Sequence, residues 1–378
     1  MSSPLPRRAH QALIRKLAEA RRRAPGGDVV TGYHNTNLVL PLGVPLALLL
    51  GVGVRALGVR GKFRVPVRTV EVVPRLWHRE ADVLRAVGAT VGEVPRCLAD
   101  FGEWSLHSYL TGEPLSELVP EGPVGEDRLR HFAGFFARLA SVPVERMPSP
   151  PEAYWPQPGD SRQFLGWLAK FADDKVHRVN EQRFGGLFRA VGVPDDAIER
   201  FMTRLPDRLT DRPYAVLHTD VHRGNVVVGR APGGRERLCV IDWELALYGD
   251  PLHDLATHLV RMDYDDAERR RMTDLWAQAM RANGHEAMTA GMDTDLAHYV
   301  DFEYVQSVFP DVMRAAIGLG ETPSDAEFAA AADRVLRAME RAWKPLDLGA
   351  GKPLDRARAD EALRAWHREQ HGRRPAHA

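Results

Sequence analysis

The stretch YAVLHTDVHRGNVVVGRAPGGRERLCVIDWELALYGDPLHDLA, residues 214–256, carries the strongest pattern in this 378-residue chain. Its first half holds an H-x-D-x-x-x-x-N pattern at His218–Asn225, with apolar residues at 215–217 before it and at 226–228 after it. Short apolar runs on both sides of a polar segment are typical of two strands joined by a loop. We therefore expect a strand, a polar loop and a second strand.

The second half of the stretch adds a further strand that ends in an acid. Pro232-Gly233-Gly234 is a strong turn signal, and the apolar run 238–241 that follows stops at Asp242. The predicted hairpin brings Asp220, Asn225 and Asp242 to one end of a small sheet.

These three side chains match what phosphoryl transfer requires. One carboxylate must orient and deprotonate the attacking hydroxyl, while a second carboxylate and an amide oxygen hold the magnesium ions that bridge the nucleotide phosphates. A polar hairpin with capping acids is the structural alternative. We prefer the catalytic interpretation because three separated residues and their flanking strands agree with it.

On these residues the sequence resembles the aminoglycoside phosphotransferase family, whose relatives include choline kinases and, more distantly, protein kinases. In that family the loop carries H-x-D-x-x-x-x-N and the next strand ends in I-D-W or I-D-F, as Ile241-Asp242-Trp243 does here. The resemblance implies that Asp220 is the catalytic aspartate and that Asn225 and Asp242 are magnesium ligands.

The composition is that of an ordinary soluble protein, long enough for two lobes with separate cores. Lysine plus arginine and aspartate plus glutamate both total 51, so no net charge points to nucleic acid or a membrane surface. Cys97 and Cys239, both in apolar strand-like runs, are the two cysteines. This count argues against a disulfide framework and fits a reducing cytosol.

Two segments near the N-terminus mimic targeting or membrane signals. Residues 7–24 form a basic helical pattern like that of a transit peptide, but the apolar face is short, so we expect a leader helix packed on the first lobe. Residues 38–54 hold no charge and could be mistaken for a membrane span. Prolines and glycines break this run, and we expect a strand end followed by a short buried helix at Leu46–Leu50.

A hairpin is predicted over Asp28–Leu42, with a polar tip that contains one glycine. Such a tip can offer backbone N–H groups to a triphosphate, and it looks like the nucleotide loop of the family. We assign nucleotide binding to Gly32, His34, Asn35 and Asn37, with an unrelated surface turn as the alternative.

The next predicted strand must supply a cation for the nucleotide phosphates. Kinases pair a strand cation with a helix glutamate, and Arg64-Val65-Pro66 resembles a run found in some family members. We expect Arg64 to bind phosphate oxygens and Glu80, in a helix predicted over Arg79–Val87, to hold Arg64 in place. Lys62 and Arg68 are rivals for the same role.

The segment Trp104–Leu110 follows an apolar strand near Cys97 and precedes Gly112. The resemblance implies that it joins the two lobes and that the backbone of Ser108, Tyr109 and Leu110 binds the purine. Main-chain contacts of this kind do not distinguish ATP from GTP.

The sequence allows more than one role for several residues near Asp220. His222 stands where protein kinases keep a phosphate-contacting lysine, so a catalytic role and a packing role both fit it. Arg223 replaces a proline usual in the family and either adds charge near the γ-phosphate or faces solvent. His218 is expected to fix the loop through backbone hydrogen bonds. Asp250 and Asp254 are expected to cap or brace the next helix, although Asp250 is close enough in sequence to tune the metal site.

Helical patterns dominate the remainder. Apolar residues recur at helical spacing over 127–142, which indicates a core helix. Further helices are predicted over 163–189, 194–209, 253–262, 267–282, 297–317 and 325–343.

The acceptor pocket is expected in this helical part. A polyamine sugar would require several converging carboxylates, and the candidates in the sequence are Asp263, Asp265, Asp266, Asp301, Glu303 and Asp311. Each of them also fits a solvated helix position. We assign substrate binding to Asp263, Asp265, Asp301 and Glu303.

The sequence thus predicts an α+β protein with a two-lobed, protein-kinase-like fold, in which a small β-rich N-lobe precedes a larger and mainly helical C-lobe. The expected division is a basic leader helix at 1–27, the N-lobe at 28–110, the C-lobe at 111–346 and a C-terminal extension at 347–378.

The expected function is that of a cytoplasmic kinase, monomeric or weakly dimeric, that uses Mg²⁺ and ATP or GTP to phosphorylate a hydroxyl of a small molecule. An antibiotic is the preferred acceptor, in resistance, self-protection or tailoring. The alternatives are a metabolic kinase of the choline, homoserine or sugar type and a nucleotide-binding regulator without turnover. No nucleic acid or membrane partner is expected.

Overall fold

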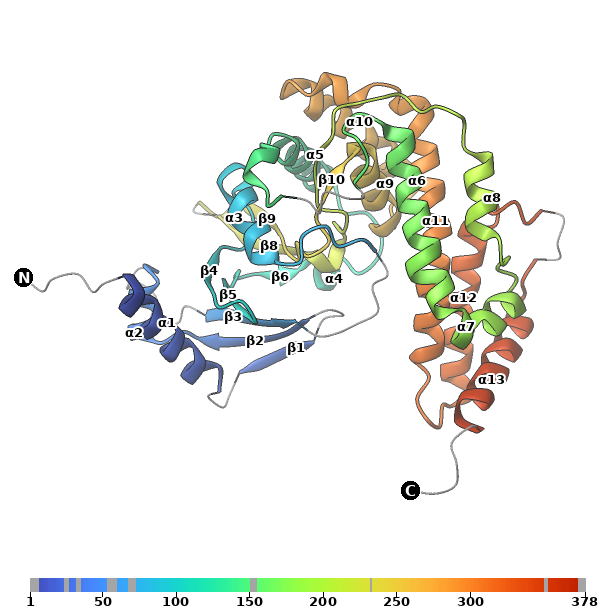
Figure 1. The fold of residues 1–378 in the computed structure, drawn as a ribbon, viewed down its shortest axis with the longest axis horizontal. Coiled ribbons are helices and arrows are strands. Elements are labelled where there is room, and N and C mark those ends of the chain that lie inside the picture. Colours follow the sequence, from blue (N-terminus) through green and yellow to red (C-terminus); the bar gives the residue numbers. More distant parts are fainter. Residues whose placement is uncertain are drawn as a thin grey trace, which may run out of the picture.

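A computed structural model of the protein describes residues 7–23, 27–31, 35–52, 60–66, 73–149, 155–231, 233–349 and 353–372. It has two lobes, a small one built on a β-sheet and a larger, mainly helical one (Figure 1). Gly32 and His34 of the predicted nucleotide hairpin and the rival cation Arg68 lie outside the described residues.

Five antiparallel strands form the sheet of the small lobe, in the order β1-β2-β3-β5-β4. Their bounds are β1 Asp28–Thr31, β2 Asn35–Pro41, β3 Arg60–Pro66, β4 Cys97–Asp100 and β5 Ser105–Ser108. The predicted leader helix is α1 (Arg7–Arg22), whose Ala18 is fully buried in a small apolar core with Leu40 and Phe63. The short helix predicted after β2 is α2 (Val44–Leu49).

Helix α3 (Glu80–Val91) links the small lobe to the large one. Its buried Val83, Leu84 and Val87 belong to the core of the large lobe, where α3 contacts α5 (Glu126–Ala140). The helix that carries Glu80 is therefore anchored on the side of the catalytic loop.

The central stretch forms the three strands that its pattern predicts, β7 (Ala215–Leu217), β8 (Val226–Arg230) and β9 (Glu236–Val240). Strands β8 and β9 make a hairpin, with β6 (Glu113–Pro114) on the other edge of β8. Strand β7 is not part of this sheet, because it pairs with β10 (Leu247–Gly249). The polar loop turns through the 3₁₀ turn η3 (Arg223–Asn225) and so leaves one sheet for the other.

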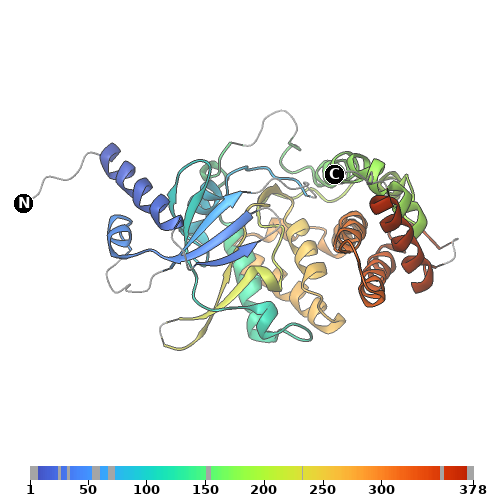
Figure 2. The same cartoon turned by 90° about the horizontal axis from the view of Figure 1, so that it is seen from below.

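Helices complete the large lobe, and those of residues 161–204 and 292–372 lie at the end opposite the five-stranded sheet (Figure 2). Their bounds are α4 Leu115–Leu118, η1 Val144–Arg146, α6 Ser161–Phe171, the π turn η2 Ala172–His177, α7 Arg178–Val191, α8 Ala197–Arg204, α9 Pro251–Arg261, α10 Asp266–Ala282, η4 Glu286–Thr289, α11 Met292–Ile317, α12 Asp325–Ala342 and α13 Arg356–Gly372.

Two segments of this lobe differ from the sequence-based expectation. The single helix predicted over 163–189 is α6 and α7 with a π turn between them. The C-terminal extension contains α13, which no pattern predicted and which packs on α7 and α12 with Ala359, Leu363 and Trp366 buried. Within the described ranges no helix is long and apolar enough to cross a bilayer.

Candidate active site

A buried carboxylate holds the loop after β7 in a strained shape. Thr219 has a φ of 61°, a conformation that β-branched residues rarely adopt. The backbone N–H groups of His218 and Thr219 each donate to Asp254 on α9 at 2.8 Å, and Thr219 Oγ1 donates to the carbonyl of Leu245 at 2.7 Å. Burial raises the pKa of the Asp254 carboxyl to about 7, although the two N–H donors act to lower it. Asp254 thus braces the loop that carries Asp220.

His218 fixes the same loop to the strand that precedes Asp242. Its Nδ1 accepts from the backbone N–H of Asp220 at 3.2 Å, and Nε2 donates to the carbonyl of Ile241 at 3.2 Å. Burial lowers the pKa of His218 to about 4, so the ring is neutral near pH 7 and keeps one donor and one acceptor. These are the backbone hydrogen bonds expected for His218.

Asp220 is oriented by groups on both of its carboxylate oxygens. Asn225 Nδ2 donates to Oδ2 at 2.9 Å and to the Asp220 carbonyl at 3.0 Å, which leaves the amide oxygen of Asn225 available for a cation. On the other side, Arg261 Nη1 donates to Oδ1, and His222 Nε2 lies 3.7 Å from the same oxygen. His222 accepts from the N–H of Gly224 at 3.1 Å through Nδ1, and burial lowers the pKa of its ring.

Asp242 stands two residues after the end of β9 and has a φ of 67°, a left-handed conformation that aspartate tolerates better than most residues. Burial acts to raise the pKa of the Asp242 carboxyl, but Arg64, whose Nη2 donates to Oδ1 at 2.8 Å, holds it below its ordinary value. Asp242, Asn225 and Asp220 line one cavity.

The donor set in this cavity fits Mg²⁺. No three His, Cys, Asp or Glu side chains of the described residues gather into a metal site of their own. A carboxylate from Asp242 and the amide oxygen of Asn225 are a sparse oxygen set, and Mg²⁺ usually takes one or two protein ligands together with substrate phosphates and water.

Arg64 contacts three carboxylates at once. Its Nε lies 2.9 Å from Glu80 Oε2, and its Nη2 donates to Asp242 at 2.8 Å and to Glu244 Oε2 at 2.9 Å. Burial acts to lower the pKa of Arg64, but these acids hold it above its ordinary value. The rival Lys62 makes no ion pair within the described part of the chain.

Glu80 also joins the two lobes. While Oε2 faces Arg64, Oε1 accepts from the backbone N–H of Trp243 at 2.8 Å. The predicted pairing of a strand cation with a helix glutamate is present, and the glutamate is also bonded to the residue that follows Asp242.

The remaining predicted nucleotide residues lie on β2, at the end of β5 and directly after it. Asn37 stands opposite Arg64 in the β2–β3 register and is buried, and its Oδ1 finds no donor among the described residues. The backbone of Asn35 ends the same pairing. The N–H of Ser108 donates to Arg96 O at 2.8 Å and that of Tyr109 to Arg60 O at 3.4 Å. Within the part of the chain that the structure describes, the N–H of Leu110 makes no such bond.

The structure places Arg223 in neither expected position. It is buried, and its guanidinium donates to the carbonyls of Val119 at 2.8 Å, Gly122 at 2.7 Å and Met262 at 3.0 Å. Because its three nitrogens face the backbone, Arg223 neither approaches the cavity nor faces solvent. It ties the loop after α4 to the end of α9.

Asp250 caps α9 and is not part of the cavity. Its Oδ1 accepts from Leu252 N–H at 2.9 Å, and its Oδ2 accepts from Arg212 at 2.7 Å and from the Tyr299 hydroxyl at 2.7 Å. The expected capping role is present, whereas the alternative role in tuning the metal site has no contact to support it.

The cavity has a volume of about 550 Å³ and extends from Asp220 and Asp242 to the helices α9, α11 and α12. Of the predicted substrate residues, Asp263 and Glu303 line it, as does the candidate Asp311. Asp265 instead caps α10 by accepting from Glu268 N–H at 2.8 Å, and Asp301 is half-buried outside the cavity. A helical pattern in the sequence does not distinguish these two positions from positions that line a pocket.

Four charged residues of the cavity were not predicted. Glu244 stands two residues after Asp242, and that proximity was the available signal. Arg261, Arg314 and Arg341 come from three helices, so no local pattern connects them.

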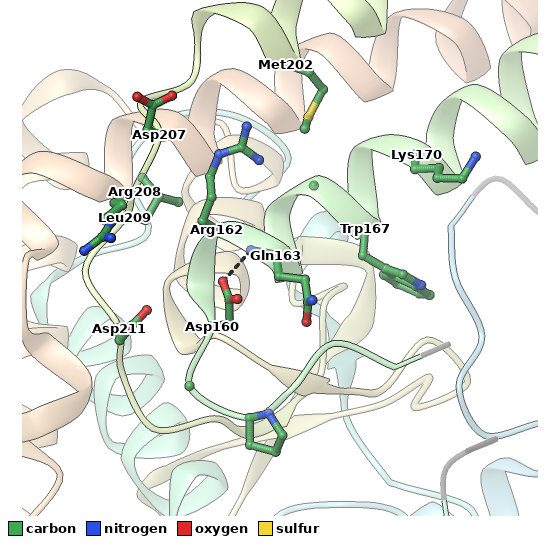
Figure 3. A pocket seen from close by; sticks show the side chains of 13 residues that line it. Asp160, Arg162, Gln163, Trp167, Lys170, Met202, Asp207, Arg208, Leu209 and Asp211 are labelled. Atoms are coloured by element: carbon green, nitrogen blue, oxygen red, sulfur yellow. Dashed lines mark hydrogen bonds between the residues drawn. The ribbon is translucent and has the colours of Figure 1, made fainter. Parts of the chain in front are cut away.

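A larger cavity, of about 910 Å³, opens between α6, α8 and the loop at 207–211 (Figure 3). There Asp160 caps α6 by accepting from Gln163 N–H at 2.7 Å. None of the predicted site residues lines this cavity, so its size alone does not make it the candidate site.

Residues 64–291 match the model of the phosphotransferase enzyme family. The chain belongs to this family. The match begins at Arg64 and covers both Asp242 and the loop that carries Asp220. No curated protein matches the sequence of this phosphotransferase.

Solved structures share the fold of this phosphotransferase at low sequence identity. A protein of Ralstonia eutropha, provisionally described as an aminoglycoside phosphotransferase, has 16% identity and a TM-score of 0.53 over 89% of this chain and 98% of its own. The ethanolamine kinase of Plasmodium vivax has 9% identity and a TM-score of 0.53 over 93% and 89%. The GDP and kanamycin complex of APH(2″)-IIIa has 15% identity and a TM-score of 0.50 over 88% and 98%. These similarities establish the two-lobed, kinase-like fold.

Proposed function

We propose that this phosphotransferase transfers the γ-phosphoryl group of ATP or GTP to a hydroxyl group of a small molecule. The observation that carries the proposal is that Asp220, Asn225 and Asp242 line one cavity, with Arg64 bonded to Asp242 at 2.8 Å. A candidate base and a candidate cation site then line a space that can hold an acceptor, and a candidate phosphate clamp is bonded to that cation site.

Each residue has a separate task in this proposal. Asp220 accepts the proton of the acceptor hydroxyl while the hydroxyl oxygen attacks the γ-phosphorus. The bond between that phosphorus and the β–γ bridging oxygen breaks, and the nucleoside diphosphate leaves. Asn225 keeps the carboxylate of Asp220 in position. Arg64 binds phosphate oxygens, and Glu80 fixes the direction of its guanidinium.

Asn225 and Asp242 are the residues that would hold magnesium. When bound, Mg²⁺ neutralises charge on the nucleotide phosphates. The ring of His222 lies next to the carboxylate of Asp220, and its proposed role is to restrict the rotation of that carboxylate.

An antibiotic is the preferred acceptor in this proposal, since one solved structure of the same fold holds GDP and kanamycin together. The ethanolamine kinase of the same fold supports a metabolic kinase as the second candidate. A screen of hydroxylated antibiotics and metabolites by coupled turnover with ATP and GTP separates the two.

The decisive experiment on the chemistry is Asp220→Asn. We expect it to leave folding and nucleotide affinity close to those of the wild type and to lower turnover by about 10²–10⁴-fold, because the acceptor loses its base. Asp207→Asn, an exposed position in the other cavity, is the matched control and keeps full turnover. A folded Asp220→Asn protein that retains most of its activity refutes the assignment. Nucleotide binding by the wild type without turnover on any acceptor or on water favours the regulator instead.

A further inference from the structure

Helices α1 and α2 form a protruding tip of the small lobe. The two helices contact each other and lie at the end of that lobe that points away from α11, α12 and α13 (Figures 1 and 2). One side of α1 packs on the sheet through Ala18, which is fully buried, and through the partly buried Ile14 and Leu17. None of the residues of the tip lines the cavity beside Asp220. The outer side of the tip is therefore a surface with no assigned role.

The charge on α1 is strongly positive. Its 16 residues include six arginine and lysine side chains against the single acid Glu19. The chain as a whole has no net charge, so this excess is local. Arg15 pairs with Glu19 at 2.9 Å, whereas the exposed Arg8 and Lys16 form no ion pair with any residue that the structure describes. The tip thus carries positive charge that the protein itself does not neutralise.

Apolar side chains are exposed beside these cations. Of the seven large apolar side chains that are exposed in the described part of the chain, three belong to the tip: Leu13 at 37%, Val44 at 44% and Leu48 at 53%. Helix α2 has the sequence VPLALL, without a charge, and its Val44 and Leu48 lie one turn apart on the same side. On α1, Leu13 and Lys16 are likewise one turn apart. Apolar and cationic groups are therefore exposed together on one tip.

This combination fits the surface of a membrane that contains anionic lipids. The negative potential of such a surface attracts lysine and arginine, and aliphatic side chains on helices enter the boundary between headgroups and acyl chains. A second copy of the chain would instead bring positive charge against positive charge. An acidic protein fits less well, because protein interfaces are enriched in aromatic residues and depleted in lysine, whereas the exposed large apolar side chains of the tip are aliphatic.

We propose that the tip formed by α1 and α2 is a peripheral membrane-binding surface. Arg8 and Lys16 contact anionic headgroups, and Leu13, Val44 and Leu48 enter the headgroup region. This surface is independent of the phosphoryl transfer proposed above. It departs from the expectation of no membrane partner, which rested on the equal totals of 51 basic and 51 acidic residues, because those totals do not show the local excess on α1.

Co-sedimentation of the full-length protein with vesicles over a range of lipid concentrations tests the proposal. One set of vesicles is phosphatidylcholine alone, and the other is phosphatidylcholine and phosphatidylglycerol in equal parts. We expect binding to the anionic vesicles to be stronger by about tenfold or more, since each cation near such a surface contributes about fivefold. Raising the salt concentration from about 0.1 M to about 1 M shortens the screening length from about 10 Å to about 3 Å and should remove most of this difference.

Variants separate the contribution of charge from that of the apolar side chains. Lys16→Glu reverses one charge and should weaken binding to anionic vesicles by about tenfold or more. Leu48→Ser should weaken it by about fivefold or more, because the side chain that enters the bilayer is lost. The matched controls are Lys175→Glu and Ile317→Ser, which are exposed positions of the large lobe, and both should bind like the wild type.

The proposal is overturned if the two kinds of vesicle bind the wild type equally, if neither binds it, or if Lys16→Glu or Leu48→Ser binds like its matched control. Retention on a polyglutamate resin without binding to vesicles would assign the tip to an acidic protein and would also overturn it. The measurement needs neither nucleotide nor acceptor, so its result does not depend on the proposed phosphoryl transfer.

Discussion

Replacing Arg64 by alanine removes the cation that holds three carboxylates together. The guanidinium lies 2.8–2.9 Å from oxygens of Glu80, Asp242 and Glu244, and the side chains of Arg64, Glu80 and Glu244 are only 5–6% exposed. Removing one partner of a buried ion pair costs about 3–5 kcal/mol, because the remaining charge loses its counter-charge. Arg75, whose Nη2 lies 3.7 Å from Glu244 Oε2, remains near one of the three acids. We therefore expect Arg64→Ala to lower the free energy of unfolding by about 3–5 kcal/mol when magnesium is absent.

Two further variants on the same strand calibrate this effect. Arg64→Lys keeps the charge but replaces a fork by a single ammonium, so it should recover part of the lost stability and part of the nucleotide affinity. Arg60→Ala removes the partly exposed arginine that pairs with Asp28 and should change stability little.

Urea unfolding with and without Mg²⁺ and calorimetric titration of nucleotide measure both consequences. Magnesium should restore more stability to Arg64→Ala than it adds to the wild type, since a divalent cation relieves the repulsion among the three acids. The apparent Michaelis constant for nucleotide should rise and turnover should fall, with the same changes in milder form in Glu80→Ala. The reasoning is refuted if Arg64→Ala is as stable as Arg60→Ala and binds nucleotide like the wild type, in which case Lys62 or Arg68 becomes the clamp.

Three other predictions test neighbouring features. Asp242→Ala should weaken magnesium-dependent nucleotide binding as well as turnover, measured by titration at several Mg²⁺ concentrations, and an unchanged metal dependence would show that another residue is the ligand. Asp254→Ala leaves the buried N–H groups of His218 and Thr219 without an acceptor, so it should lower the free energy of unfolding in urea by about 1–3 kcal/mol per N–H. It should also lower turnover more than nucleotide affinity, and equal effects on both would contradict the role of Asp254 as a brace of the loop that carries Asp220. Burial lowers the pKa of His258 to about 4 in the folded protein. In the unfolded chain this ring binds a proton below about pH 6.5, whereas in the folded protein it does so only below about pH 4. The stability advantage of the wild type over His258→Gln should therefore shrink by about 1 kcal/mol from pH 7 to pH 5.5 in paired denaturation curves, and an advantage independent of pH would disprove the lowered value.

The parts of the site that were predictable from the sequence depend on short-range geometry. Asp220 and Asn225 lie in one loop, and their hydrogen bond needs no information beyond that loop. Arg64 and Glu80 are farther apart, yet a strand followed by a helix restricts where each can point, and the predicted pair is present.

The parts that were missed depend on packing between distant segments. Arg223 was placed near the phosphate or in solvent, but carbonyls of Val119, Gly122 and Met262 bind it, and nothing in the local sequence reveals them. The pairing of β7 with β10 has the same cause, since the sequence shows that β7 is a strand without showing which strand it joins.

Helix α13 was missed for a different reason. Its buried residues Ala359, Leu363 and Trp366 do recur at helical spacing, but they stand among many charged residues in a segment that begins with glycine and proline. Its stability comes from contacts with α7 and α12, which a local pattern does not contain.

The hydrogen bond from Trp243 N–H to Glu80 has a consequence for how the enzyme would open. Glu80 belongs to α3, and Trp243 directly follows the proposed metal ligand Asp242. If β3 moved away from α3 and the loop that carries Asp220, Arg64 would separate from Asp242 and from Glu80 in the same step, because α3 is packed on the large lobe. The ion pairs of Arg79 and Arg85 with Asp100 would hold the β4 edge of the sheet against α3. Product release and disassembly of the phosphate clamp would then be a single movement, with β3 as the moving part and α3 as the stationary one.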